Sequence, residues 1–339
     1  RLSRKWLIVG SLFVWSAVTF LMGYATTFEQ LYGLRAVMGI SEALYIPSAL
    51  SLIADWHQDK SRSLAIGVHM TGLYVGQAIG GFGATAAAAF SWQSTFHWFG
   101  IVGIAYSVVL IFFLHENPVR MKIEKVVANG ISKGNSIGKG LLLLFSNISF
   151  WVILFYFAAP SLPGWATKNW LPTLFAENLD IPMSQAGPIS TITIALSSFV
   201  GVILGGFLSD RWVLKNIRGR VYTGAIGLGM TIPALLLLGF GHGFISVIGA
   251  GLLFGIGFGI FDANNMPILC QFVSAKYRGT AYGIMNMTGV FAGAAVTQLL
   301  GKWTDGGSLG EGFAMLSIVV ALALGLQLYF LRPKTDNME

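Results

Sequence analysis

The sequence predicts an all-α protein that crosses a lipid bilayer many times. Of its 339 residues, 55% are hydrophobic and only 10% are charged, whereas about a quarter of the residues in an ordinary soluble domain are charged. The hydrophobic residues lie in blocks, most of them about 18 residues or longer, which is the length that a helix needs to cross a hydrocarbon core about 30 Å thick. A soluble fold of this size is therefore excluded.

Ten hydrophobic spans follow one another along the chain. The longest polar stretch, residues 115–146, separates four spans from six, and we expect it to be a cytoplasmic linker between an N-terminal bundle (1–114) and a six-helix C-terminal bundle (147–339). Polar breaks place the spans at about residues 6–26, 30–54, 63–90, 94–114, 147–178, 185–209, 220–240, 243–271, 279–301 and 310–331.

The basic residues gather on one side of the predicted membrane. Threading the chain back and forth places 18 of the 21 Lys and Arg residues in the breaks on that side, and the exceptions are Arg35, Lys168 and Lys302. Basic loops are typical of the cytoplasmic side. We therefore expect a multi-pass protein of the cell inner (plasma) membrane with both ends of this chain in the cytoplasm. The bilayer accounts for the net charge of +7 without nucleic acid as a partner.

Patterns typical of enzymes fail on inspection. The run 134–140 is one residue short of a P-loop and has no Ser or Thr after Lys139. The glycines of residues 255–259 lie inside a membrane span and not after a strand, so they do not indicate a dinucleotide site. The five histidines show no metal-ligand spacing, and one cysteine, Cys270, excludes an internal disulfide. We expect no enzyme activity, no cofactor and no metal.

An internal repeat relates the two halves of the chain. Residues 39–47 (GISEALYIP) share glycine, isoleucine, an acid, alanine and proline with residues 259–267 (GIFDANNMP), and residues 62–67 (RSLAIG) match residues 278–283 (RGTAYG). Each half is thus a copy of one six-helix unit, and the first copy is short by two helices, so we expect an N-terminally truncated chain. Parallel repeats of this kind are typical of alternating-access transporters, which hold the solute near the bilayer midplane between the halves.

These residues resemble the anion:cation symporter branch of the major facilitator superfamily. The resemblance implies the two-bundle fold of that superfamily, with ten of its twelve transmembrane helices present and residues 1–114 supplying helices three to six. Spinster-type lipid carriers share a similar run of Arg, Gly-Ile-x-Glu-Ala and Pro. The motifs that carry the resemblance are Arg35, Gly39, Glu42, Pro47, Arg62, the glycines Gly67, Gly72, Gly76 and Gly80, the stretch 206–211 (GFLSDR) and residues 170–173 (WLPT).

Arg35 and Glu42 are the first candidates for a transport site. They lie seven residues apart, which is two turns along one face of the second span. A charged side chain inside a membrane is costly unless it is paired or hydrated, so each is a functional candidate. We expect Arg35 to attract an anionic group and Glu42 to carry a coupling proton. The alternative is a structural pair that locks two helices together. An arginine at this position lines the cavity in the resembled family.

Asp262, Asn264 and Asn265 form a polar cluster directly before Pro267 in the eighth span. An aspartate with two amides is not expected to face lipid. We expect the amides to contact the solute and Asp262 to carry the coupling ion. The alternative is that Asp262 bonds a neighbouring helix, as polar residues in membrane bundles do.

The fifth span contains Pro160, Pro163 and Gly164, followed by the candidate substrate-binding residues Trp165, Lys168, Asn169 and Trp170. Because proline removes a backbone donor, we expect these prolines to interrupt the helix, as in a gating helix. Lys168 is predicted to add a second positive charge for an anion, and the tryptophans to stack on a sugar-like ring. The alternatives are an ammonium that reaches the outer interface and an interfacial tryptophan belt.

Two further groups of residues complete the predicted site. In the third span, Tyr74 and Gln77 are candidate substrate contacts, and His69 is either a proton relay or a structural histidine. At the cytoplasmic breaks, charged residues are expected to close an inward gate through charge pairs and helix ends, or the cations serve only as a topological signal. The predicted gating residues are Arg1, Arg4, Lys5, Asp210, Arg211, Arg218 and Arg220.

The sequence thus predicts secondary active symport of a small organic anion, a sugar acid or related carboxylate, with a coupling proton or cation. No nucleotide-binding domain is visible that would supply energy instead. We expect a monomer that works by alternating access. The alternatives are a Spinster-like lysolipid or lipid transporter and a non-transporting receptor or scaffold with the same fold. A receptor would have little need for Arg35, Glu42 and Asp262 inside the membrane.

Overall fold

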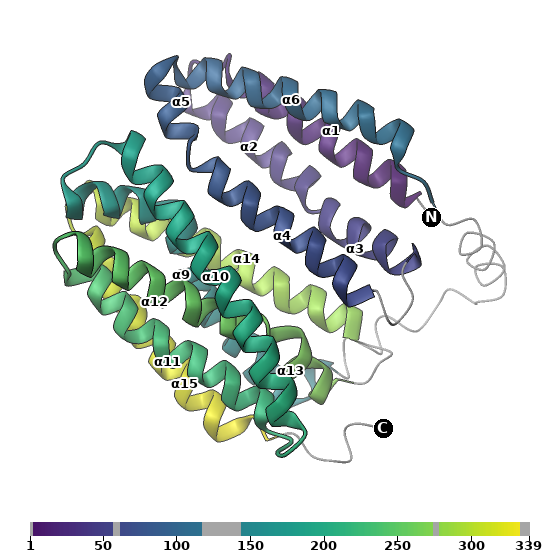
Figure 1. The fold of residues 1–339 in the computed structure, drawn as a ribbon, viewed down its shortest axis with the longest axis vertical. Helices are drawn as coiled ribbons and strands as arrows, with labels where there is room; N and C mark the ends of the chain where they lie inside the picture. Colours follow the sequence, from purple (N-terminus) through teal and green to yellow (C-terminus); the bar gives the residue numbers. More distant parts are fainter. Residues whose placement is uncertain (1–2, 57–61, 117–143, 274–277, 333–339) are drawn as a thin grey trace. The chain divides into compact units, whose positions relative to one another are not determined.

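The computed structural model describes residues 3–56, 62–116, 144–273 and 278–332 (Figure 1). Every regular element within these ranges is a helix. Eight of the helical segments are long and apolar enough to cross a membrane. The predicted spans 30–54 and 63–90 correspond instead to the helix pairs α2 with α3 and α4 with α5, each divided by a short break. The prediction of an all-α polytopic protein is confirmed.

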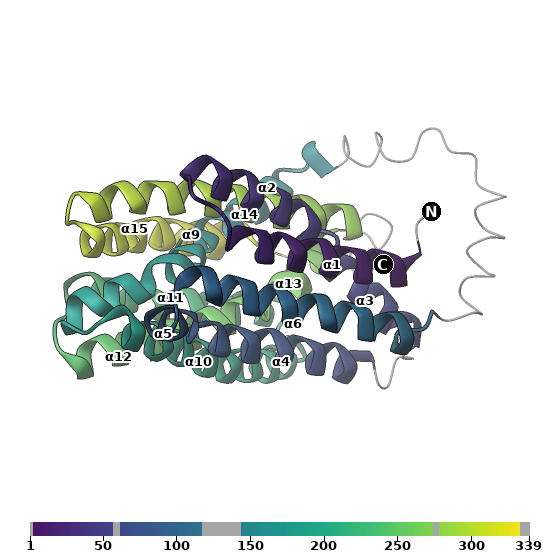
Figure 2. The same ribbon diagram turned by 90° about the horizontal axis from the view of Figure 1, so that it is seen from above.

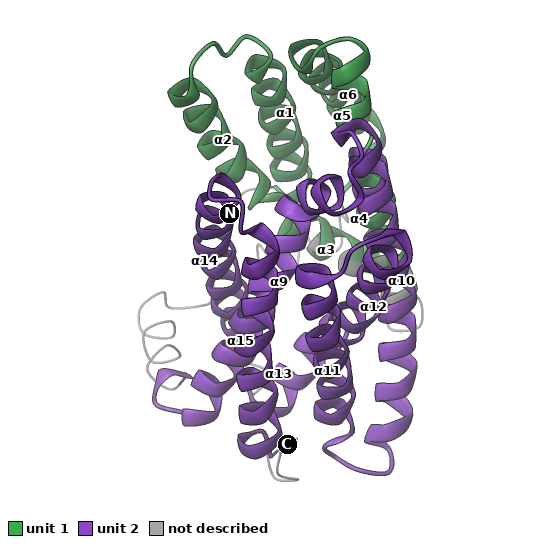
Figure 3. Ribbon diagram, turned by 90° about the vertical axis from the view of Figure 1, so that its left-hand side faces the viewer, with its two compact units in different colours: residues 1–76, 82–133 green, residues 77–81, 134–339 purple. Residues whose placement is uncertain are grey.

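The chain forms two compact units, which we describe separately. Unit 1 comprises residues 1–76 and 82–133, and unit 2 comprises residues 77–81 and 134–339 (Figure 3). Most of the predicted linker 115–146, from residue 117 to residue 143, lies outside the described residues. The P-loop-like run 134–140 and Arg1 also lie outside them.

Unit 1 is organised around its first helix. This helix, α1, contacts α2, α3 and α6, and α5 packs against α6. Helix α6 approaches α1 closely because Gly100 has no side chain: a Cβ there would lie 2.6 Å from the Phe20 Cα. The helices are α1 (Arg4–Met22), α2 (Phe28–Glu42), α3 (Tyr45–Trp56), α4 (Arg62–Gly80), α5 (Gly83–Ala89) and α6 (Trp92–Phe113), and residues 77–80 at the end of α4 belong to unit 2.

Unit 2 contains the largest hydrophobic core. Helix α9 packs against α14 and α15 (Figure 2), while α11 packs against α12 and α15 (Figure 1). Tyr156, Phe175, Phe254 and Phe313 are among its largest fully buried side chains. The helices are α9 (Ile148–Leu179), α10 (Met183–Val213), α11 (Gly219–Phe240), α12 (Phe244–Asp262), α13 (Asn265–Phe272), α14 (Arg278–Asp305) and α15 (Leu309–Phe330).

Helices α10 and α12 meet backbone to backbone. A Cβ at Gly205 would lie 2.7 Å from the Ile260 Cα, and one at Gly259 would lie 2.9 Å from the Val202 backbone nitrogen. Small residues at the interface let membrane helices approach closely, because van der Waals packing drives their association where water cannot. Glycine is therefore required at these positions by the distance between the two helices.

A matched helix break divides the repeated motif in each unit. Helix α2 ends at Glu42 and α3 begins at Tyr45, while α12 ends at Asp262 and α13 begins at Asn265. The cap residues Ala43 and Ala263 have almost the same torsions, φ −59° and ψ −23° against φ −58° and ψ −23°.

Proline explains why both breaks fall at the same place. Pro47 and Pro267 are the third residues of α3 and α13. A proline has no N–H for the carbonyl four residues earlier and its ring clashes with that carbonyl, so it is favoured in the first turn of a helix, where no such bond is lost. The carbonyls left without that donor belong to Ala43 and Ala263.

The prediction of an interruption at Pro160 and Pro163 is wrong. Helix α9 continues from Ile148 to Leu179 through both prolines and through Pro172. Side chains of α9 bond carbonyls of the same helix: the Ser161 Oγ donates to the Phe157 oxygen at 2.7 Å, and the Thr167 Oγ1 donates to the Gly164 oxygen at 3.0 Å. Packing against α14 and α15 supports the helix along its length.

The close approach of α10 and α12 gives a paired stability prediction. Gly205→Ala places a methyl group against backbone, so we expect it to lower stability by about 1–3 kcal/mol, the usual cost of overpacking. Gly206→Ala is the control, because a Cβ at Gly206 meets no described atom within 4 Å. We expect it to be neutral or stabilising, by up to about 1 kcal/mol from helix propensity. Thermal unfolding of both variants in detergent measures the difference, and equal effects would contradict the packing argument.

Candidate functional site

In unit 1, Arg35 and Glu42 lie on α2 and attract each other electrostatically. Both side chains are exposed within the described chain. The adjacent face of α2 packs on α1: the Ser11 Oγ donates to the Ser41 carbonyl at 2.5 Å, and the Thr19 Oγ1 lies 3.8 Å from the Met38 Sδ. This packing fixes the rotation of α2 and leaves the charged pair accessible beside it.

An aromatic cluster begins directly after Glu42. The ring centroid of Tyr45 lies 6.0 Å from that of Trp15 and 6.0 Å from that of His69. The Nε2 of His69 is buried and has no hydrogen-bond partner among the described residues. Tyr74 and Gln77 lie farther along α4 and are partly buried. The structure thus brings His69 close to the α2–α3 break.

In unit 2, the α12–α13 break gathers polar groups around Asp262. The Asn265 Nδ2 donates to the Asp262 Oδ1 at 3.1 Å. The Lys168 ammonium of α9 attracts the Asp262 carboxylate. The hydroxyl groups of Tyr156 and Tyr282 lie close enough to interact electrostatically with Asp262. Asp262 itself is exposed within the described chain. The break therefore brings together an exposed acid, an exposed cation and a buried amide.

Three oxygens near this break are buried without a partner among the described residues. They are the Asn264 Oδ1, the Asn265 Oδ1 and the Tyr156 Oη, from side chains that are 0%, 5% and 2% exposed. The Asn264 Nδ2 donates to the Ile260 carbonyl at 2.8 Å, so its amide is oriented. A buried polar group left unpaired costs about 1–3 kcal/mol. Such a cluster calls for water, an ion or a ligand group.

The predicted aromatic residues of α9 serve to hold α9 against α14. The Asn169 Nδ2 donates to the Thr297 Oγ1 at 3.0 Å, and the Trp170 Nε1 donates to the Thr297 carbonyl at 3.1 Å. The ring of Trp165 packs against Gly293, where a Cβ would lie 2.6 Å from the Trp165 Nε1. The Lys168 Nζ lies 4.9 Å from the Trp165 ring centroid. These contacts position the Lys168 ammonium.

Tyr156 and Tyr282 were not predicted as site residues. Tyr282 lies in the repeated segment 278–283, where its counterpart is Ile66. A polar residue that replaces an apolar one in a repeat is a signal that a sequence can show. Tyr156 gives a weaker signal, a single hydroxyl in the apolar run 150–159. Its proximity to Asp262 depends on tertiary packing.

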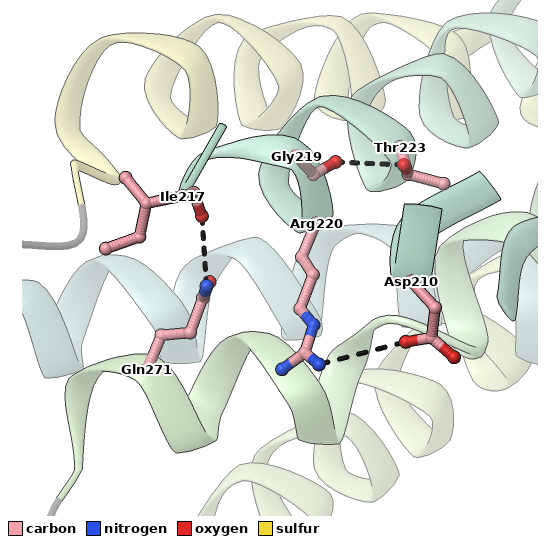
Figure 4. Close-up of polar contacts among 6 residues, drawn as sticks. All are labelled: Asp210, Ile217, Gly219, Arg220, Thr223 and Gln271. Atoms are coloured by element: carbon pink, nitrogen blue, oxygen red, sulfur yellow. Dashed lines mark hydrogen bonds and ion pairs between the residues drawn. The ribbon is translucent and has the colours of Figure 1, made fainter. Parts of the chain in front are cut away.

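Of the predicted gating residues, four surround the connection between α10 and α11. The Arg220 Nη2 lies 3.8 Å from the Asp210 Oδ1, and the Gln271 Nε2 of α13 donates to the Ile217 carbonyl at 3.0 Å (Figure 4). Arg211 lies 4.1 Å from the Phe207 ring centroid, and Arg218 lies 4.9 Å from that of Tyr222. This connection therefore ties three helices, α10, α11 and α13.

The same backbone contact appears in both units. The Lys5 Nζ donates to the Ile111 carbonyl at 2.6 Å, and the Arg218 Nη2 donates to the Leu328 carbonyl at 2.6 Å. Each acceptor is two residues before the last residue of its helix, α6 or α15. A cation near helix C-terminal carbonyls is favourable. Lys5 and Arg218 thus each join two helices of their own unit.

Glu116 completes the contacts at the start of α1. Its Oε1 accepts from the Ser3 Oγ at 2.5 Å and from the Lys5 backbone N–H at 2.9 Å. Desolvation raises the pKa of Glu116, but the hydrogen bonds from Ser3, Lys5 and Arg4 and the positive charge of Arg4 outweigh it and hold the pKa below the usual 4.5. A carboxylate at a helix N-terminus is favourable for the same electrostatic reason.

The sequence matches a known family along most of its length. A profile of the Major Facilitator Superfamily matches residues 1–297. The chain belongs to this superfamily. As a superfamily member it is a multi-pass membrane transport protein.

Two curated relatives of this superfamily member show how far the similarity extends. The D-galactonate transporter of Escherichia coli O6:H1 is 26% identical over 351 residues, which cover 92% of this chain and 76% of that protein. The voltage-gated purine nucleotide uniporter SLC17A9 of Rattus norvegicus is 26% identical over 308 residues, which cover 87% of this chain and 66% of that protein. The chain thus spans 66% to 76% of the length of these relatives.

A solved structure confirms the superfamily fold. A bacterial homologue of the human lysosomal transporter Spinster, in an inward-facing and unoccupied conformation, superposes with a TM-score of 0.78 at 17% sequence identity. The match covers 99% of this chain and 85% of that chain. The fold predicted from the repeat is therefore the fold observed.

The low pKa of Glu116 predicts a pH-dependent contribution to stability. A carboxylate whose pKa falls on folding stabilises the protein above its unfolded pKa, about 4.5, and loses that contribution as the pH falls through the folded value. We expect Glu116→Gln to lower the melting temperature at pH 7, and the difference from the unmodified protein to shrink below about pH 4.5. Thermal unfolding in detergent from pH 7 to pH 3.5 tests this. A difference that is the same at every pH would show that the charge has no role.

Proposed function

We propose that this superfamily member is a secondary active transporter that carries a small organic anion together with a proton or a cation. The observation that carries the proposal is the pair of matched helix breaks. The helix before each break ends with an acidic residue, Glu42 in α2 and Asp262 in α12. Glu42 attracts Arg35, and Asp262 attracts Lys168. Ionisable groups inside a membrane protein mark ion and substrate pathways.

The cations Arg35 and Lys168 make an anion the substrate that fits best. Arg35 is exposed within unit 1, and Lys168 is exposed within unit 2. Guanidinium and ammonium groups bind carboxylates through charge-assisted hydrogen bonds. The similarity to a D-galactonate transporter supports a sugar acid or a related carboxylate as the substrate class. The side chains of Tyr74 and Gln77 supply hydrogen bonds for its hydroxyl groups, because the amides of Asn264 and Asn265 are buried.

Coupling follows from competition for the basic residues. While no anion is bound, Glu42 and Asp262 neutralise Arg35 and Lys168. An anion that takes a basic residue as its own partner leaves the carboxylate unpaired, and an unpaired charge in a low dielectric favours uptake of a proton or a cation. His69, close to the α2–α3 break, is a candidate proton relay. The anion and the coupling ion then bind together, as symport requires.

We further propose the arrangement in the cell. The carrier is a monomer of the inner membrane, with both ends of this chain in the cytoplasm and with residues 1–114 and 147–339 as its bundles. Arg4, Lys5, Asp210, Arg211, Arg218 and Arg220 hold the ends of the helices that form the inward gate.

A lipid substrate is the second candidate, because Arg35, residues 39–43 (GISEA) and Pro47 also resemble a run found in Spinster-type lipid carriers. A carrier for lysolipids needs apolar contacts for an acyl chain more than it needs two basic residues. A receptor that does not transport has no need for either charged pair.

Uptake measurements test the proposed function directly. Vesicles that contain the full-length protein are given a panel of labelled sugar acids, with a lysolipid as the alternative substrate, under an imposed pH or sodium gradient. We expect gradient-driven accumulation of at least one sugar acid. Movement of the lysolipid alone, or no transport of any solute under either gradient, would overturn the proposal.

Two substitutions separate anion binding from coupling. Arg35→Ala removes a charge-assisted contact worth about 1.5–3 kcal/mol, so we expect the affinity for the anion to fall about 10- to 100-fold. Glu42→Gln removes the titrating carboxylate, so we expect accumulation against a gradient to stop while exchange of internal for external anion continues. Arg332→Gln, outside the spans, is the control for a lost positive charge. Normal accumulation by Glu42→Gln would refute the coupling role.

A further inference from the structure

The α12–α13 break in unit 2 collects oxygen atoms. Asp262 contributes a carboxylate, Asn265 holds that carboxylate through a bond of 3.1 Å and has a free amide oxygen, and Tyr156 contributes a buried hydroxyl. Pro267 has no N–H to donate to the Ala263 carbonyl. The last carbonyls of α12 also carry the partial negative charge of a helix C-terminus.

The buried oxygens need a donor or a positive charge. The Oδ1 atoms of Asn264 and Asn265 accept nothing from any described residue. Both side chains are at least nine-tenths buried. In transporters built from discontinuous helices, the backbone carbonyls of the unwound segment and of helix C-terminal ends coordinate sodium ions or protons. A bound positive ion is one group that would satisfy oxygens in this position.

The repeat provides an internal comparison. Unit 1 has the same break, with the same cap torsions, but Leu44 and Tyr45 stand where unit 2 has Asn264 and Asn265. The backbone alone does not explain the amides, because the break in unit 1 forms without them. The side-chain amides of Asn264 and Asn265 in unit 2 are therefore not needed to break the helix and have another role.

We propose that this break binds a monovalent cation of the sodium type, held by the Asp262 carboxylate, the Asn265 Oδ1, the Ala263 carbonyl and the Tyr156 hydroxyl. The inference rests on the proposed symport function and names the ion that accompanies the anion. All the ligands are oxygens with one formal negative charge, which suits a singly charged hard cation. Ca²⁺ sites usually recruit several carboxylates, and no cluster of three His, Cys, Asp or Glu side chains occurs among the described residues.

Lys168 links this ion to the anion. Its ammonium attracts Asp262 and so competes with a cation for the same carboxylate. An anion that binds Lys168 reduces this competition, and the cation then binds more tightly. By thermodynamic linkage the cation strengthens anion binding by the same factor. Lys168 therefore has opposite effects on the two ligands.

The test measures cation binding without any anion. Melting temperatures of the purified full-length protein are recorded in NaCl, LiCl and KCl, with choline chloride replacing each salt at constant ionic strength. We expect a saturable increase with sodium over choline. Asp262→Asn abolishes the increase, and Asn265→Ala weakens the apparent sodium affinity about 10- to 100-fold, the range for groups that orient an ion ligand. Glu177→Gln, which removes an exposed carboxylate of α9 that belongs to neither break, is the control and keeps the sodium effect.

Lys168→Met provides the outcome that a merely structural role would not give. We expect it to raise the apparent sodium affinity and to lower the affinity for the anion. No specific effect of sodium, lithium or potassium, or a sodium effect that persists in both Asp262→Asn and Asn265→Ala, would overturn the cation site. Anion uptake driven by a pH gradient alone, without sodium dependence, would overturn this inference and leave the proposed function standing.

Discussion

A proline in the first turn of a helix has no N–H for the carbonyl four residues earlier. Both halves of this transporter have such a proline, and a helix break before it, at the same position of the repeat. In lipid an unsatisfied carbonyl is costly, so the break requires polar surroundings. Pro47 and Pro267 thereby set where Glu42 and Asp262 lie, as the last residues of α2 and α12. The polar character of the candidate site follows from the backbone before any substrate is considered.

The two halves share this backbone and differ in the side chains around it. In unit 1 the basic partner, Arg35, comes from the same helix as the acid, and aromatic rings follow the break. In unit 2 the basic partner, Lys168, comes from α9, and amides follow the break. Duplication with divergence gives one carrier two chemically different places to hold charge. This difference is a physical basis for binding two unlike solutes in one transport cycle.

Hydropathy and the repeat were sufficient to predict the fold, because length and composition decide which segments cross a bilayer. The positions at which helices break could not be predicted as well from the sequence. Pro160 and Pro163 suggested a break in α9, yet α9 is continuous and packs on α14 and α15 along its length. The real breaks, at Ala43 and Ala263, fall inside spans that appear uniform in hydropathy.

The acids and bases of the candidate site were visible in the sequence because charge inside a membrane span is rare. Asn264 and Asn265 were also predicted, but other neighbours were not. Tyr156 interacts electrostatically with Asp262 only because tertiary packing brings the two residues together. Thr297 can be identified as a partner of Trp170 only once α9 and α14 are known to lie side by side. The contacts of Lys5 and Arg218 end on backbone carbonyls, which no side-chain pattern reveals.

The backbone contact between α10 and α12 has a mechanical consequence. Where Gly205 and Gly259 leave no side chains between two helices, there is nothing that can change rotamer to let one helix slide past the other. The pair is expected to move as a single rigid rod. Any force that a bound solute exerts at the end of α12 then acts directly on the C-terminal end of α10, beside Asp210.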